Sequence, residues 1–176
     1  MISGVLRSAT LAVACLAGTA LWAQESTNRV AADTDWSVFV EGDPQECWSV
    51  SAPKETALLD SSGNPTDGIR GDILLFVFYR PGAGVDGQVT FTGGYPFAGG
   101  STVTLDIGGE SYELFTEDEW AWPATPEDDA RIVAAMKRGA SAELTGRSGR
   151  GNTTVDEFSL LGFTAAVEEA QRRCDG

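Results

Sequence analysis

The run Ile73-Leu74-Leu75-Phe76-Val77-Phe78-Tyr79 is the segment that decides the fold. Its residues are all apolar or aromatic, and the run ends at the turn-forming residues Arg80-Pro81-Gly82. A continuous apolar run of this length, bounded by a turn, is typical of a strand in the middle of a sheet. The pattern therefore predicts a central strand buried on both faces, around which the core of the domain forms.

Shorter segments with strand patterns lie on both sides of this run. Two precede it, Trp36-Ser37-Val38-Phe39-Val40 and Cys47-Trp48-Ser49-Val50-Ser51, and a turn through Gly42-Asp43-Pro44 separates them. Gly108-Gly109 predicts a two-residue hairpin turn, because both positions can adopt positive φ. Apolar and polar residues alternate in the later segments, at 88–92, 102–107, 111–115, 142–144 and 155–160. Many short antiparallel strands joined by turns predict a mainly β protein, a β-sandwich in preference to a closed barrel.

Two helices are predicted within this β pattern. Thr125-Pro126-Glu127-Asp128 resembles a capping box with proline at the first helical position, and Gly139 predicts the end of that helix. The second helix is predicted from about residue 164 to residue 173. Its apolar face comes from residues spaced four, three and four apart, namely Phe163, Val167, Ala170 and Cys174.

The first 23 residues have the layout of a secretory signal peptide. Arg7 precedes a short apolar stretch at 11–17, and small residues follow at 18–20. The stretch is too short to span a bilayer, which takes about 20 apolar residues. We expect cleavage after Ala23, with cleavage after Ala20 as one alternative and a lipid anchor on Cys15 as another. The chain is therefore predicted to be exported, to the periplasm or cell envelope or into the medium.

The mature chain is predicted to be one domain without a membrane span. Residues 24–35 are polar and predict a flexible lead-in, and residues 36–176 are of a length that forms a single core. The formal net charge of the whole chain is −14, and the leader carries no acidic residue. Such an acidic chain is not expected to bind nucleic acid or anionic lipid through charge, because phosphate groups attract basic surfaces.

Two cysteines remain once the leader with Cys15 is removed. They are Cys47 and Cys174, near opposite ends of the mature chain. Extracytoplasmic compartments favour oxidation of such an even pair, so a long-range disulfide is predicted, with two unrelated thiols as the alternative. Because Cys174 lies on the apolar face of the second predicted helix, the bond would join that helix to the strand that holds Cys47.

Five short motifs are spread over nearly the whole mature chain. They are Asp35-Trp36-Ser37-Val38, Glu46-Cys47-Trp48-Ser49-Val50-Ser51, Gly71-Asp72-Ile73-Leu74-Leu75-Phe76-Val77, Phe91-Thr92-Gly93-Gly94-Tyr95-Pro96-Phe97 and Phe158-Ser159-Leu160-Leu161-Gly162-Phe163-Thr164-Ala165-Ala166. As a set they resemble the invasion associated locus B family. The resemblance implies an immunoglobulin-like antiparallel β-sandwich, export to the bacterial envelope and no established catalytic activity. It implies a role in host-cell entry only for pathogenic members.

The chain departs from this family pattern at two places. Many members have a cysteine shortly after the first tryptophan, where this chain has Phe39-Val40, and a cysteine pair in the middle of the domain. Here the middle segment is Glu117-Asp118-Glu119-Trp120-Ala121-Trp122. Only one disulfide can therefore form, and a surface that other members use for invasion is not carried over to this chain.

The composition leaves few routes to catalysis, and no enzymatic activity is predicted. The chain has no histidine, which excludes a Ser-His-Asp site and histidine-ligated metal within it. Serine–lysine chemistry would need Lys54 or Lys137, and neither has an accompanying motif. The carboxylates of Glu117, Asp118 and Glu119 leave a hydrolase with a carboxylate pair as the third hypothesis. No cofactor is predicted.

The loop from Asp60 to Gly68 superficially resembles a calcium loop. Oxygen-bearing side chains alternate along it, but Pro65 and Gly71 stand where an EF-hand needs glycine and glutamate. A turn-rich connection is the better explanation, so no metal site is predicted.

Two aromatic groups predict a binding surface. Trp120 and Trp122 share one face of a strand at a spacing of two, and Tyr95 and Phe97 bracket a proline between glycine pairs. These rings would either fill the end of the sandwich or anchor a partner. The leading hypothesis is a non-enzymatic envelope protein that binds a protein or envelope component. The alternative is a periplasmic module that binds a small ligand or glycan through the same four residues.

Overall fold

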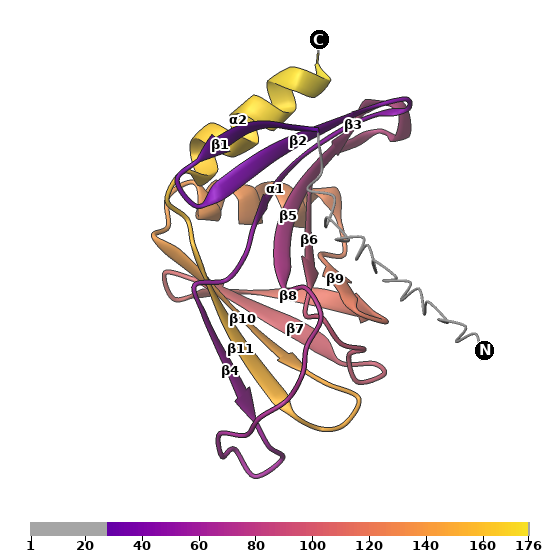
Figure 1. Cartoon of the computed structure of the whole chain (residues 1–176). Coiled ribbons are helices and arrows are strands. Elements are labelled where there is room, and N and C mark those ends of the chain that lie inside the picture. Colours follow the sequence, from indigo (N-terminus) through magenta and orange to yellow (C-terminus); the bar gives the residue numbers. More distant parts are fainter. Residues whose placement is uncertain (1–27, 176) are drawn as a thin grey trace, which may run out of the picture.

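The computed structural model describes residues 28–175 as a mainly β domain with two α-helices (Figure 1). Its strands form one antiparallel sheet in the order β1-β2-β3-β5-β6-β9-β8-β7-β10-β11-β4. The first six strands in sequence are β1 Arg29–Asp33, β2 Trp36–Gly42, β3 Gln45–Ser51, β4 Glu55–Leu59, β5 Leu74–Arg80 and β6 Val85–Thr92. The remaining strands are β7 Thr102–Ile107, β8 Glu110–Glu117, β9 Trp120–Trp122, β10 Ser141–Arg147 and β11 Thr153–Ser159.

The central strand β5 is buried on one face and partly exposed on the other. Leu75, Val77 and Tyr79 point into the core, whereas Phe76 and Phe78 alternate with them and retain part of their exposure. The prediction of burial on both faces is therefore wrong. A continuous apolar run is typical of a strand in a sheet that has helices packed on both of its faces. In this fold both helices leave the outer face of β5 uncovered.

The sheet folds back on itself, so strands that are distant in the sheet share one core. The Phe91 ring of β6 lies edge-on to the Phe158 ring of β11, with centroids 6.1 Å apart. At another point the indole nitrogen of Trp36 in β2 donates a hydrogen bond of 3.0 Å to the carbonyl oxygen of Ser159. Both contacts join strands that are not neighbours in the hydrogen-bonded order.

The prediction of a mainly β, antiparallel fold with two short helices is confirmed, but two separate sheets of an immunoglobulin-like sandwich are not observed. The three-residue strand β9 pairs with β6 on one side and with β8 on the other. This short strand makes the hydrogen bonding continuous between the two halves of the sheet, which face each other in Figure 1. Sequence patterns did not reveal this link because three residues are too few to show a period.

Both helices begin at or next to their predicted starts, and the predicted apolar face of the second helix is confirmed. Helix α1 spans Pro126–Met136, and the hydroxyl of its N-cap Thr125 accepts a hydrogen bond from the Asp128 amide. Helix α2 spans Phe163–Cys174 and lies along β1, β2 and β3 (Figure 1). The four residues predicted to form its apolar face are all buried. Cys174 at its end is bonded to Cys47 in β3, which confirms the predicted disulfide.

The predicted flexible lead-in is wrong over residues 29–33. These residues form β1, which pairs with β2 at one edge of the sheet and places Ala31 opposite Val38. An edge strand is held by backbone hydrogen bonds to a single neighbouring strand. It can therefore form without a clear alternation of apolar and polar residues in its sequence. The predicted signal peptide and its cleavage after Ala23 lie outside the described residues. Within residues 28–175, no helix is long and apolar enough to cross a membrane.

A buried carboxylate fixes α1 against the sheet where β9 ends. Asp129 of α1 is 7% exposed, and its carboxylate accepts a hydrogen bond of 2.8 Å from the backbone amide of Val89 in β6. This amide lies beyond the short region that β9 covers, so the helix side chain replaces a strand partner. Burial raises the pKa of Asp129 to about 6, the Val89 amide opposes this shift, and the neighbouring Asp128 charge adds to it.

Substituting Asp129→Asn should raise the melting temperature at about pH 7.5. Because the folded-state pKa is about 6 and the ordinary value is 3.8, this group destabilises the fold as pH rises through that window. A shift of about two units corresponds to roughly 3 kcal/mol at most, and we expect a gain of about 1–2 kcal/mol because the asparagine oxygen still accepts the Val89 hydrogen bond. Thermal melts at pH 3.5 and 7.5 measure this. A difference between variant and parent that is the same at both pH values would contradict the prediction.

Candidate binding surface

The structure separates the four predicted surface residues into two environments. Tyr95 and Phe97 pack toward the core, where their rings lie edge-to-face at 5.0 Å and Phe97 is only 7% exposed. The Tyr95 hydroxyl lies 2.6 Å from the Thr154 hydroxyl, and burial raises the pKa of Tyr95. These two rings therefore contribute to packing between sheet halves rather than to an outer surface.

Trp120 and Trp122 lie on the outer face of the sheet. Ala121 between them is fully buried, so the alternation of the strand places both indoles on the opposite side. Trp120 is 41% exposed and Trp122 is partly buried. Of the two predicted aromatic groups, only this one faces outward.

Trp120 is the end of a continuous line of aromatic side chains, which we call the outer aromatic row. Neighbouring ring centroids along it are 5.1–6.0 Å apart, and its members come from β2, β3, β5 and β9. At a spacing of about 4.8 Å between strands, the row crosses roughly 19 Å of the sheet. Its members are Phe39, Trp48, Phe78, Phe76 and Trp120.

Strand register brings these rings together. Phe39 lies directly opposite Trp48, and Trp48 lies directly opposite Phe78. Directly opposite residues point to the same face, and the residues that alternate with them, such as Val38 and Val77, fill the core. Of the five members of the row, only Trp120 was predicted from the sequence to belong to a binding surface. The other four are aromatic residues at outward positions of their strands, and only the strand register shows that they lie side by side.

The outer aromatic row has an acidic border that is partly neutralised. Glu41 and Glu46 lie opposite each other at the Phe39–Trp48 end, and Glu117 lies opposite Trp120. The Arg80 guanidinium lies over the Phe78 ring at 4.4 Å and pairs with Glu46 at 3.1 Å. The Arg80 guanidinium thus makes a cation–π contact with one ring of the row and covers part of its face.

The acidic hairpin tip proposed for hydrolysis has a structural role. The backbone carbonyl oxygen of Asp118 accepts a hydrogen bond from the Phe97 amide at 2.8 Å, and that of Glu119 accepts one from the Gly93 amide at 3.3 Å. Asp118 also adopts a positive φ of 51° at the turn. The tip thus holds the 93–97 loop, with Glu117 as the last residue of β8 and with Asp118 and Glu119 in the turn before β9.

The loop that resembled a calcium site uses its acid to form a turn. The Asp60 carboxylate accepts hydrogen bonds from the Ser62 and Asn64 amides at 2.8 and 3.0 Å, which lower its pKa. Within the described chain, no group of three or more aspartate, glutamate or cysteine side chains could hold a metal ion.

The chain is similar to a known protein in structure and not in sequence. No family model matches the sequence, and no curated protein matches it significantly. The crystal structure of invasion associated protein B from Bartonella henselae matches the fold with a TM-score of 0.56, covering 83% of this chain and 98% of that chain. The chain has the fold of invasion associated protein B. The sequence identity is 14%, so the likeness to invasion associated protein B establishes the fold alone.

Proposed function

We propose that this chain is a non-enzymatic, exported cell-envelope protein that binds a partner protein through the outer aromatic row. The observation that carries the proposal is the continuity of five rings on a sheet face that neither helix covers. Aromatic side chains anchor protein interfaces because they bury a large area with little loss of conformational entropy. An outward row of this length is more than the scattered apolar residues of an ordinary surface.

The charges around the row favour a basic partner surface. Glu41, Glu46 and Glu117 border the rings, and the whole chain has a formal net charge of −14. A partner with apolar side chains and exposed arginine or lysine would match both the rings and the border. The Arg80–Phe78 contact provides an internal example of that chemistry.

Export is supported by two independent features. The first is the signal-peptide pattern of the leader, and the second is the Cys47–Cys174 disulfide, a bond that persists in oxidising compartments. We place the mature chain in the periplasm or cell envelope, with release into the medium as a further destination. We propose no catalytic role, since the lysines that could serve a nucleophilic serine pair with acids, Lys54 with Asp35 and Lys137 with Glu168.

The Trp120→Ser variant tests this function. Because Trp120 is 41% exposed, the substitution should cost about 2 kcal/mol of unfolding free energy, compared with about 3–5 kcal/mol for a ring in a packed interior. Capture of a crosslinked partner by the tagged chain, recovered from the envelope fraction with its N-terminus at or near Gln24, should fall at least tenfold. Thermal melts and quantitative mass spectrometry of the captured material measure the two effects.

Leu161→Ser is the matched control. Leu161 is a large apolar residue that is 62% exposed, and it lies outside the row, before α2. It should leave capture unchanged. Equal capture by both variants would exclude the row as the binding surface, and a loss of several kcal/mol from Trp120→Ser would show that the indole serves packing.

Glycan binding is the second candidate, because an exposed aromatic ring can also pack against the apolar face of a sugar. The Phe39 and Trp48 rings are stacked with an interplanar angle of 9°, and those of Phe76 and Phe78 with one of 15°. Trp120 at the end of the row is 41% exposed and is the ring that a sugar would contact. A glycan array separates the candidates: a hit that Trp120→Ser abolishes supports the glycan, and absence of hits with retained protein capture supports the protein partner.

A further inference from the structure

One edge of β8 has no strand beside its first half. β8 pairs with β7 from Glu110 to Phe115, but on its other side it pairs with β9 only from Phe115 onward. β9 ends at Trp122, and the following Pro123 has no amide hydrogen to continue the ladder. The chain then turns into α1, so the outer edge of residues 110–114 is left without a strand partner among the described residues.

A groove lies between this edge and α1. Two adjoining cavities of about 550 and 380 Å³ make it up, and both are lined by Ser111, Tyr112 and Arg131. Ser111 and Tyr112 point to opposite faces of β8, so a cavity that both line must lie along the strand edge. On the far side of α1, Asp129 already caps the β6 edge through the Val89 amide. The helix therefore covers one free edge and leaves the other open.

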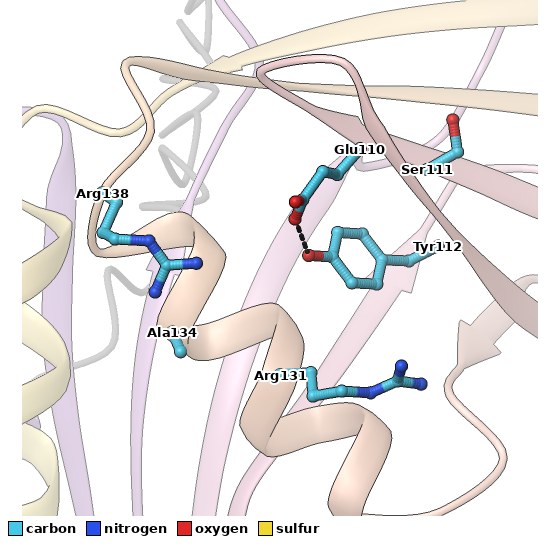
Figure 2. A pocket seen from close by; sticks show the side chains of 6 residues that line it. All are labelled: Glu110, Ser111, Tyr112, Arg131, Ala134 and Arg138. Atoms are coloured by element: carbon cyan, nitrogen blue, oxygen red, sulfur yellow. Dashed lines mark hydrogen bonds between the residues drawn. The ribbon is translucent and has the colours of Figure 1, made fainter.

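The two ends of the groove differ in charge. At the Glu110 end, Arg131 and Arg138 face Tyr112 across the gap, and Figure 2 shows both guanidinium groups on the helix side. The Glu110 carboxylate there accepts a hydrogen bond of 2.9 Å from the Tyr112 hydroxyl, and Arg131 pairs with Asp128. Arg138 makes no salt bridge within residues 28–175, so it is the cation that a ligand could pair with. At the other end the lining combines apolar residues, Phe115, Ala124 and Ile132, with the acidic residues Glu113 and Asp128.

We propose that this groove binds an extended peptide segment of a partner protein, which adds a strand to the free edge of β8 and pairs a carboxylate with Arg138. A guest strand antiparallel to β8 would continue the direction of β9 and run from the Phe115 end toward the Glu110 end. Its carboxyl-terminal end therefore arrives at Arg138. Backbone hydrogen bonds to residues 110–114 supply affinity, and Arg138 at one end of the groove supplies specificity for a carboxylate. This site is separate from the outer aromatic row.

A library of synthetic octapeptides with free carboxyl termini tests the proposal. The mature, oxidised chain should retain peptides that alternate branched or aromatic residues with polar ones and that end in a carboxylate or an acidic residue. Arg138→Glu should weaken the best peptide at least tenfold. Alternate N-methylation of the peptide backbone should abolish its binding, because a methylated amide cannot donate to the strand edge.

Two controls keep the outcomes distinct. Arg172→Glu reverses an exposed arginine of α2 and should leave peptide binding unchanged, as should Trp120→Ser, so failure of the aromatic site and failure of this one are separable. Unchanged melting temperature of Arg138→Glu shows that the variant is folded. The proposal is overturned if the library yields no peptide retained more by the parent than by Arg138→Glu, or if N-methylated peptides bind equally well.

Discussion

Replacing both Cys47 and Cys174 with serine should lower the free energy of unfolding by about 2–5 kcal/mol. The bond joins β3 to the end of α2 across 127 residues, and both cysteines are buried. Closing so long a loop restricts the unfolded chain most strongly, and the chain-entropy model assigns it about 4–5 kcal/mol. Urea denaturation of parent and double variant measures the difference. The double substitution avoids a free thiol that could form other bonds.

Reduction of the parent chain provides the matched comparison. Parent protein kept reduced throughout the titration should lose stability by a similar amount, because the same cross-link is absent from its unfolded state. Reductant should not change the free energy of unfolding of the double variant, because that variant has no disulfide to reduce. A loss below about 1 kcal/mol in both experiments would show that α2 is held by its packing, through contacts such as Trp36 with Phe163, and that the disulfide adds little.

Substituting Asp156→Asn should cost about 3–5 kcal/mol, because it leaves a buried arginine without its counter-charge. Asp156 is fully buried in β11, and its two oxygens accept hydrogen bonds from Arg70 at 2.7 and 2.6 Å. Arg70 also donates to the Gly93 carbonyl oxygen at 2.9 Å and lies over the Tyr95 ring at 5.2 Å. The pair thus ties the segment before β5 to the opposite half of the folded sheet.

A double variant that carries both Arg70→Met and Asp156→Leu tests the reason given for the cost of Asp156→Asn. Removing both charges removes the uncompensated ion, so most of the lost stability should return. Urea titrations of the parent, Arg70→Met, Asp156→Leu and the double variant form a complete cycle. An Asp156→Asn chain as stable as the parent would mean that water reaches Arg70, and the ion pair would then be unimportant for holding the sheet halves together.

Features with local causes could be predicted from the sequence. The start of α1 depends on Thr125 and its proline, and the buried face of α2 depends on the spacing of Phe163, Val167 and Ala170. The disulfide could be predicted because only two cysteines remain once the predicted leader with Cys15 is set aside. The structural match to invasion associated protein B confirms the resemblance that the motifs indicated, but the immunoglobulin-like sandwich that this resemblance implied is not observed.

Features with long-range causes could not be predicted. The outer aromatic row depends on the register that sets Trp48 opposite both Phe39 and Phe78, and register is decided by pairing across the sheet rather than by any one strand. Tyr95 and Phe97 looked exposed because glycines surround them, yet the folded sheet buries Phe97 against Phe91. The continuity of the sheet through β9 depends likewise on tertiary packing.

Site-specific photo-crosslinking in intact cells tests the binding role of the outer aromatic row most directly. A photoreactive phenylalanine analogue placed in turn at Phe39, Phe78 and Trp120 samples β2, β5 and β9, and the same analogue at Leu161 samples a surface outside the row. The proposed function predicts one partner protein crosslinked from all three row positions and absent from the Leu161 position. Three row positions that yield no partner, or the same set of proteins as Leu161, would contradict it.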